Sequence, residues 1–364
     1  MRESTFAFTN SMTRTGVLLS NIGTPDEPTP EAVGSYLRQF LMDEYVLDMP
    51  FIKRWLLVNR IIVPRRKHYA AEHYQKIQMA EGSPLLVYTQ RFAAGLKSEL
   101  SEDYVVEIGM RYGNPSIQAG LANLKKAGVD RIVAVPLYPQ YTQSSFETAV
   151  VETKKQGKKL GLTDKLKFVD PFYIDPGFIE SWGEIVREHF EKYSADHILF
   201  SYHGVPVRHI QQIDTTGYCQ NNAACCAQIG SANQNCYRAQ CHATSRAIAT
   251  NLDLKADEFT TCFQSQFGKD EWIGPSFEDL LVDLPKRGIK SIAVACPSFV
   301  ADCLETLEEI GIRGREEFKE AGGEELSLIP CVNDYPLWIR AAANLIRATV
   351  EQTRVVSASA ASAH

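Results

Sequence analysis

Short apolar runs recur along this chain and alternate with amphipathic stretches, and this rhythm limits the fold more than any other feature. Runs rich in Val, Ile and Leu with helical patterns between them are typical of parallel strands that helices cover on both faces. Four such runs occupy each half, at residues 16–21, 104–110, 131–138 and 166–170, and then at 197–203, 259–266, 290–297 and 325–330. We therefore predict an α/β protein with two similar doubly wound domains, each with a four-stranded parallel sheet flanked by helices.

The length of the chain supports two domains. Its 364 residues, 45% of them apolar, exceed the size at which a single core usually stops growing. We expect an N-terminal domain at residues 13–175, a C-terminal domain at 176–352 and a disordered tail at 353–364. Ligands of such sheets bind beyond the carboxyl ends of the strands. The site is therefore expected at these ends, in the cleft between the domains.

Charge and hydropathy exclude two classes of partner or placement. The net charge is −6 and the basic residues are scattered, so no basic stripe indicates a nucleic-acid partner. No run approaches the ~18 apolar residues that a membrane-spanning helix needs. The N-terminal residues lack the apolar centre of a signal peptide. We expect a cytoplasmic protein that does not cross a membrane.

One histidine lies where an α/β protein exposes reactive groups. His203 directly follows the apolar run at 197–203 and precedes Gly204 and Pro206. An imidazole at the carboxyl end of a strand can accept a proton or bind a metal. A histidine that only caps the strand by hydrogen bonds is the alternative.

Three carboxylates follow the run at 290–297. On a helix expected to begin at Asp302, spacing of 100° per residue puts Asp302, Glu305 and Glu309 in a narrow sector. A solvated acidic face is the ordinary explanation. Because the helix follows a strand end directly, these carboxylates could instead move protons from His203 or hold a metal ion.

Seven motifs in order along the chain resemble the ferrochelatase family. The resemblance covers roughly residues 15–350, and its motifs are LLSNIGTP, EGSPL, YPQYTQSS, HILFSYHGVP, CFQSQFGKDEWIGP, CPSFVADCLETLEEI and NDYP. It implies a porphyrin cleft between two similar four-stranded domains. It also implies insertion of ferrous iron, as substrate, into protoporphyrin IX to give haem, because LETLEEI is closer to Gram-negative members than to coproporphyrin-using ones.

The resemblance also implies which residues form the site. The equivalent of His203 lies beside the porphyrin and is assigned to proton abstraction or metal binding, with Glu305 as its closest partner. Further porphyrin-site residues implied in this way are Ile22, Tyr138, Ser144, Gln264, Ser265 and Trp272. Ile22 stands where other members carry Tyr or Met and cannot ligate a metal. It is expected to press on the ring and keep it bent.

Residues 46–67 combine large apolar side chains with Lys53, Arg54, Arg60, Arg65, Arg66 and Lys67. A core helix with snorkelling basic side chains is one explanation. The other is a lip through which porphyrin and haem pass, with its basic groups near propionates or lipid headgroups. The second explanation predicts peripheral contact with the inner membrane.

Five of the nine cysteines crowd into residues 214–241, a small, polar stretch that cannot build a core. They are Cys219, Cys225, Cys226, Cys236 and Cys241. In a reducing compartment such crowding indicates metal binding rather than disulfides. Four thiolates serve a 2Fe-2S cluster or a structural zinc, but paired C-x2-C spacings typical of zinc are missing. Some bacterial ferrochelatases carry cluster ligands in an insertion here, so four of these five are expected to hold a 2Fe-2S cluster.

Two other functions fit parts of the pattern. A cobalt chelatase of the same superfamily would share the fold and the reactive histidine, but EGSPL, YPQY and EWIGP favour the iron enzyme. A non-catalytic haem carrier or redox sensor would keep the fold and use the cysteine segment for signalling. Turnover distinguishes an enzyme from such a protein.

Overall fold

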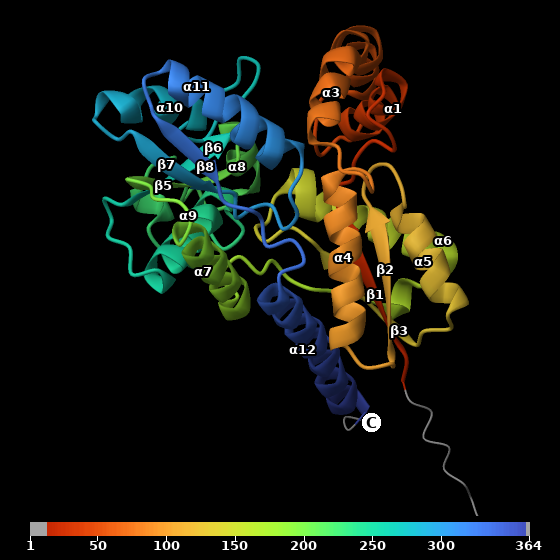
Figure 1. Cartoon of the computed structure of the whole chain (residues 1–364). Helices are drawn as coiled ribbons and strands as arrows, with labels where there is room; N and C mark the ends of the chain where they lie inside the picture. Colours follow the sequence, from red (N-terminus) through yellow and green to blue (C-terminus); the bar gives the residue numbers. More distant parts are fainter. Residues whose placement is uncertain (1–12, 362–364) are drawn as a thin grey trace, which may run out of the picture.

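The computed structural model describes residues 13–361, and both predicted sheets are present in it (Figure 1). The first sheet contains β1 (Thr15–Asn21), β2 (Tyr104–Met110), β3 (Arg131–Pro136) and β4 (Leu166–Phe168), and the second β5 (His197–His203), β6 (Phe259–Gln264), β7 (Ser291–Ala295) and β8 (Glu325–Leu328). Their orders are β2-β1-β3-β4 and β6-β5-β7-β8, and all pairings are parallel. The same order occurs twice, so the halves are structural repeats and the predicted fold class is confirmed.

Helices connect the strands. The α-helices are α1 (Pro30–Leu41), α2 (Phe51–Leu56), α3 (Val63–Ile77), α4 (Pro84–Glu99), α5 (Ile117–Lys126), α6 (Thr148–Leu160), α7 (Pro176–Phe190), α8 (Val207–Ile213), α9 (Tyr237–Asn251), α10 (Phe277–Lys286), α11 (Arg315–Glu320) and α12 (Pro336–Ala361). The π-helical stretches are η1 (Leu57–Ile62), η2 (Gln143–Glu147) and η5 (Leu304–Gly314), and the 3-10 turns are η3 (Thr163–Lys165) and η4 (Ala224–Cys226). Thr29, Ser116 and Asp175 cap α1, α5 and α7 by accepting first-turn N–H groups, which have no partner inside a helix.

One large core joins the two halves. It combines side chains of both sheets with those of α4, α7 and α12. Trp338 of α12 stacks on Phe92 of α4 with ring centroids 5.5 Å apart. Arg347 of α12 donates to the Glu99 carbonyl at the end of α4 (2.8 Å). Figure 1 shows α12, the last helix of the chain, beside α4 of the first half. The C-terminal helix therefore fixes the two sheets relative to each other.

The last helix also extends beyond the range expected for the C-terminal domain. α12 continues to Ala361, so it includes most of residues 353–364, for which a disordered tail was predicted. Residues 357–361 are all alanine or serine, and alanine has the highest intrinsic helix propensity. Residues 362–364 lie outside the described part of the chain.

The 46–67 segment contributes a long helical arm, since α2, η1 and α3 follow one another without a break. Its exposed apolar side chains are Phe51 (63%), Ile52 (72%), Trp55 (40%), Leu56 (49%) and Ile61 (43%). Arg54 is buried and donates to the carbonyls of Leu47 (2.9 Å) and Met49 (3.1 Å). Arg54 therefore does not lie near propionates or lipid headgroups, where one of the two explanations put the basic groups of this segment. No helix within residues 13–361 is long and apolar enough to cross a membrane.

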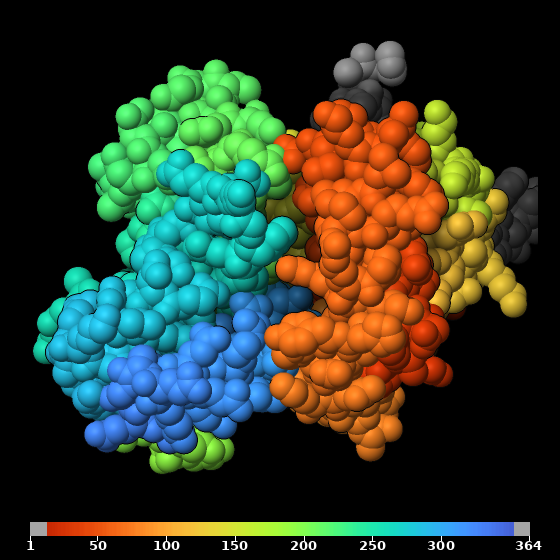
Figure 2. All heavy atoms as spheres, turned by 90° about the horizontal axis from the view of Figure 1, so that it is seen from above, coloured from red at the N-terminus to blue at the C-terminus, as the bar shows by residue number. Residues whose placement is uncertain are grey.

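The arm packs across the molecule on the other half of the chain. Val33, Ala71 and Tyr74 of α1 and α3 form an apolar cluster with Leu304 and Leu307 of η5. Figure 2 shows a furrow between the orange arm and the green-to-blue C-terminal half. The strand ends of the second sheet and the beginning of η5 belong to the C-terminal side of this interface.

Candidate active site

His203 ends β5, and its neighbour in the parallel register is Gln264 at the end of β6. The N–H of Gly204 donates to the Gln264 carbonyl (2.8 Å). A Cβ at residue 204 would lie 2.8 Å from that oxygen and 3.1 Å from the ring of Trp272. Only glycine, which has no Cβ, permits the backbone to approach so closely. Gly204 therefore allows His203, Gln264 and Trp272 to lie together.

One ring nitrogen of His203 is already engaged. Its Nδ1 lies 2.7 Å from the Gly204 carbonyl oxygen. A carbonyl can only accept, so Nδ1 carries the hydrogen and Nε2 keeps its lone pair. The side chain is partly buried. His203 is therefore oriented as a proton acceptor or metal ligand through Nε2.

Two glutamates of η5 are hydrogen-bonded to the end of β6 and the residue after it, Glu305 through its backbone carbonyl and Glu309 through its carboxylate. The Gln264 side chain donates to the Glu305 carbonyl (2.9 Å), and the Ser265 hydroxyl donates to the Glu309 carboxylate (2.9 Å). Burial and then the charge of Glu305 raise the pKa of Glu309 to about 8, against the opposing effects of Ser265 and Arg313. A carboxyl with such a pKa keeps its proton at neutral pH.

Asp302 does not lie on a common acidic face with these two residues. The helix begins at Leu304 rather than Asp302, so the 100° spacing assumed from the sequence does not apply. The Asp302 carboxylate accepts from Asn333 (2.7 Å) and Thr306 (2.9 Å), and its side chain is buried. These contacts anchor the NDYP loop to η5.

Glu308, which the sequence left outside the acidic sector, is also buried, with 3% of its side chain exposed. It forms an ion pair with His73 of α3, and Lys76 Nζ and Arg313 Nε each lie 3.7 Å from its carboxylate oxygens. No local sequence pattern indicates this pair, because its two partners come from opposite halves of the chain. The pair connects the arm to the helix that carries Glu305.

The N-terminal half supplies an apolar wall. Ile22 packs against the cluster of Tyr138 and also against the cluster that contains Cys303 of the other half. The Tyr138 hydroxyl is buried and has no hydrogen-bond partner among the described residues. Tyr36 and Tyr74, which sequence reasoning missed, are buried close enough to Glu305 for its charge to add to burial in raising the pKa of both hydroxyls.

Ser144 belongs to the N-terminal half of the chain and Trp272 to a loop of the C-terminal half. Ser144 lies on η2, and its hydroxyl shares a hydrogen bond with Thr142 (3.4 Å). The Trp272 indole N–H donates to the Phe267 carbonyl (2.9 Å). Arg66 of the arm lies over the Phe267 ring, 6.0 Å from its centroid. The Trp272 loop therefore meets the arm at the furrow.

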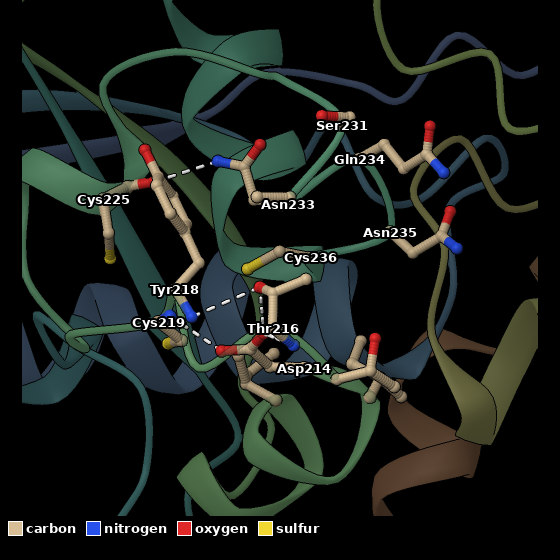
Figure 3. Close-up of a pocket in the computed structure, with 14 residues that line it drawn as sticks. Asp214, Thr216, Tyr218, Cys219, Cys225, Ser231, Asn233, Gln234, Asn235 and Cys236 are labelled. Atoms are coloured by element: carbon tan, nitrogen blue, oxygen red, sulfur yellow. Dashed lines mark hydrogen bonds between the residues drawn. The ribbon is translucent and has the colours of Figure 1, made fainter.

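The cysteine segment forms a pocket of about 120 Å³ beside α8 and α9, and Cys219, Cys225 and Cys236 line it (Figure 3). Cys226 belongs to the same small cluster, and its sulfur lies 4.0 Å from that of Cys225. A shared hydrogen bond with Cys226 lowers the pKa of Cys236, and that bond and burial raise the pKa of Cys226. Cys241 is fully buried in the main core. Among the described residues, no group of three or more His, Cys, Asp or Glu side chains is arranged so that it could hold a metal ion.

Two solved structures share the architecture. SirB from Bacillus subtilis with Fe³⁺ has a TM-score of 0.52 and 14% identity, covering 94% of this chain and 98% of that one. The sirohydrochlorin chelatase SirB of subspecies spizizenii in complex with cobalt has a TM-score of 0.52 and 11% identity, covering 93% and 96%. At this identity the likeness concerns the fold alone. It defines a two-domain α/β protein of chelatase-like architecture.

Sequence comparison is more specific. The family model named Ferrochelatase matches residues 14–350. A ferrochelatase of Bdellovibrio bacteriovorus is 44% identical over 92% of this chain and 99% of that protein. Those of Coxiella burnetii and Legionella pneumophila are 43% and 42% identical over 92% of the chain. The chain belongs to the ferrochelatase family.

Proposed function

We propose that the chain inserts Fe²⁺, its metal substrate, into protoporphyrin IX and releases haem. The observation that carries this proposal is the family match over residues 14–350 together with 44% identity to a ferrochelatase over nearly its whole length. A cobalt chelatase is not favoured, since the SirB structures share only the fold at 14% and 11% identity.

Metallation requires that two pyrrole N–H protons leave as iron enters. The free Nε2 of His203 is the acceptor for the first, because Nδ1 is held by Gly204 and the lone pair of the other ring nitrogen can accept a proton. Glu305 and Glu309 both lie on η5, and burial together with the charge of Glu305 raises the pKa of Glu309 to about 8. Glu309 therefore keeps its proton near neutral pH. The proposed role of Glu305 is to stabilise the imidazolium or the incoming cation with its carboxylate.

The other predicted site residues support this chemistry from the sides. Ile22, Tyr138 and Ser144 form the proposed porphyrin wall of the N-terminal half, and Trp272 faces it from the other half. Ile22 has only methyl and methylene groups to offer, so its proposed role is to press on the ring. Asp302 stays a predicted member of the proton path, although its hydrogen bonds favour an anchoring role.

The test is anaerobic mixing of purified protein with Fe²⁺ and protoporphyrin IX while the visible spectrum is recorded. Catalytic haem formation is expected, and stoichiometric binding without turnover would contradict the proposal and favour a haem carrier. His203→Ala should nearly abolish turnover while porphyrin binding persists. His197→Ala is the matched control, because His197 begins the strand that His203 ends, and its ring bonds to Thr260 (2.9 Å). Equal activity of the two variants would reject the role of His203.

We also propose that the cysteine segment holds a 2Fe-2S cluster. Its donor set fits, since such clusters are bound by four thiolates and Cys219, Cys225, Cys226 and Cys236 share one small cluster of side chains. The lowered pKa of Cys236 favours the thiolate that a metal requires. Cys241 is the surplus cysteine, because it packs in the main core. The sequence had left open which four of the five bind.

Purified protein should be red-brown, with about two irons and two sulfides per chain. Cys236→Ser should lose the colour, whereas Cys241→Ser should keep it. Colourless protein with one zinc, after anaerobic purification, would overturn the proposal in favour of a structural zinc site.

We propose, finally, that the exposed apolar side chains of the arm contact the inner membrane from its cytoplasmic side. Five large apolar side chains exposed on one helical arm, with basic groups between them, are typical of interfacial helices. The same surface would admit an apolar porphyrin and release haem.

A further inference from the structure

The first turn of α9 is the C-terminal end of the cysteine-rich residues 214–241, and it is hydrogen-bonded both to the preceding part of that segment and to the end of β5. Cys236 is the residue that precedes the helix, and Tyr237 begins it. The side chains of Tyr237, Arg238 and Gln240 each form hydrogen bonds with other segments. None of them has a role in the chemistry proposed above.

Tyr237 holds the end of β5. Its side chain is buried, and its hydroxyl donates to the His203 carbonyl (2.8 Å). The N–H of the same peptide group, that of Gly204, donates to the Gln264 carbonyl (2.8 Å). Both polar groups of the peptide after His203 are thus fixed. The direction of the imidazole depends on this peptide plane, because its own Nδ1 bonds to the next carbonyl.

Arg238 joins the cysteine segment to the loop of Trp272. Only 8% of the residue is exposed. One guanidinium nitrogen donates to the Asn222 carbonyl (2.8 Å) and to the Cys226 sulfur (3.3 Å). The other two nitrogens donate to the Gly274 carbonyl (3.4 and 3.2 Å). One buried cation therefore serves both segments.

The Trp272 loop is in turn paired with the chain after His203. The Ile273 N–H donates to the Val205 carbonyl (3.1 Å), and the Val207 N–H donates to the Glu271 carbonyl (2.8 Å). Gly274, whose carbonyl Arg238 holds, directly follows Ile273, so a shift of this carbonyl would be transmitted to the hydrogen bond between Ile273 and Val205.

Gln240 makes a third connection. Its side-chain nitrogen donates to the Gln234 carbonyl of the cysteine segment (2.6 Å). Its oxygen accepts the N–H of Tyr141 (2.7 Å), in the YPQY loop of the N-terminal half. The turn thus contacts both walls of the proposed porphyrin site.

We propose that Tyr237 and Arg238 are positioning residues through which the metal-bound state of the cysteine segment controls the geometry of His203 and of the Trp272 loop. This inference rests on the proposed function of the segment as a cluster site. A ligating thiolate accepts a stronger, charge-assisted hydrogen bond from Arg238 than a thiol does. Without metal, the segment has few apolar side chains to keep Asn222 and Cys226 against the guanidinium.

The first test compares Tyr237→Phe with Tyr202→Phe. Tyr202 is the matched control, because its hydroxyl also joins β5 to α9, by a hydrogen bond with Ser245 (2.9 Å), without touching His203. Each variant loses one buried hydrogen bond, so both should be destabilised similarly. Only Tyr237→Phe should exchange the Gly204 amide hydrogen about fivefold faster and lower kcat without weakening porphyrin binding. Equal exchange and equal kcat in the two variants would overturn the positioning role.

The second test measures amide exchange of Ile273 and Val207 before and after iron is removed with dithionite and bipyridyl. In the parent protein removal should speed exchange several-fold. In Arg238→Lys exchange should already be fast and should not change further. Protein that binds iron but exchanges equally before and after removal refutes the coupling alone. Protein without bound iron refutes the cluster and the coupling together, while the two tyrosine variants still decide the positioning role.

Discussion

The ion pair between Glu308 and His73 gives the sharpest prediction. Glu308 has 3% and His73 11% of its side chain exposed, and the pair joins η5 to α3. Around it lie the apolar side chains of the arm and of η5. We expect that His73→Leu, which leaves the buried carboxylate without its closest partner, destabilises the protein more than Glu308→Gln, which puts a neutral amide that can still form hydrogen bonds in the place of the carboxylate.

The magnitude follows from burial. Removing one partner of a buried pair costs about 3–5 kcal/mol, whereas exposed pairs contribute only about 0–1 kcal/mol. Lys76 and Arg313 have 49% and 42% of their side chains exposed, so they compensate in part. We expect a loss of about 3 kcal/mol for His73→Leu and about 1–2 kcal/mol for Glu308→Gln.

These losses translate into modest shifts of Tm. An unfolding entropy of about 2.1 cal/mol/K per residue gives about 0.76 kcal/mol/K for 364 residues. His73→Leu should therefore lower Tm by about 4 °C, which scanning calorimetry resolves. The double variant His73→Leu with Glu308→Leu should recover most of the loss, because an apolar pair suits these neighbours.

Glu305→Gln provides the control from the same helix. Its carboxylate is proposed to act on the reaction rather than to hold the fold, so kcat should fall while Tm stays near the parent value. If His73→Leu leaves Tm unchanged, or if the double variant loses as much stability as His73→Leu and Glu308→Leu lose together when each is measured alone, the buried ion pair does not stabilise this interface.

Three further predictions concern the same region. The pKa of Glu309 is about 8 in the folded protein, against an ordinary value of 4.5, so the unfolded chain releases this proton first and the free energy of unfolding should fall as pH rises from about 4.5 to about 8. Glu309→Gln should remove this fall. If urea titrations give the same pH dependence of the free energy of unfolding for the variant and the parent protein, the prediction is contradicted. Trp55→Ser should weaken binding to phosphatidylglycerol vesicles about tenfold, whereas Ile174→Ser, at another exposed apolar residue, should not; equal binding of the two argues against the arm as the contact. Asp48 precedes the arm and pairs with Arg208 of α8. Asp48→Asn removes this carboxylate, so limited proteolysis should cleave the arm several-fold faster. An unchanged cleavage rate would mean that this ion pair does not hold the arm.

Much of the fold could be predicted from local sequence. All eight apolar runs became strands whose ends lie within two residues of the predicted bounds, because buried parallel strands select β-branched and other apolar residues at consecutive positions. His203 was predicted at the end of a strand for the same reason, and it ends β5 beside Gln264 of β6, which only the family resemblance had indicated. For residues 46–67 the sequence left open a core helix or an exposed lip, and the structure shows that five large apolar side chains of this segment are exposed.

The sequence thus determined the two sheets, the strand-end histidine and the crowding of cysteines, since each depends on residues close together in the chain. Only the tertiary structure decided that Arg54 points inward, that Asp302 anchors a loop and that Glu308 meets His73. The π-helical geometry of η5 rotates its side chains away from the 100° spacing, and no local pattern signalled it. Partners from opposite halves meet only after both sheets have formed around their shared core. Burial then fixes which charges are paired, because an unpaired charge inside that interface is too costly.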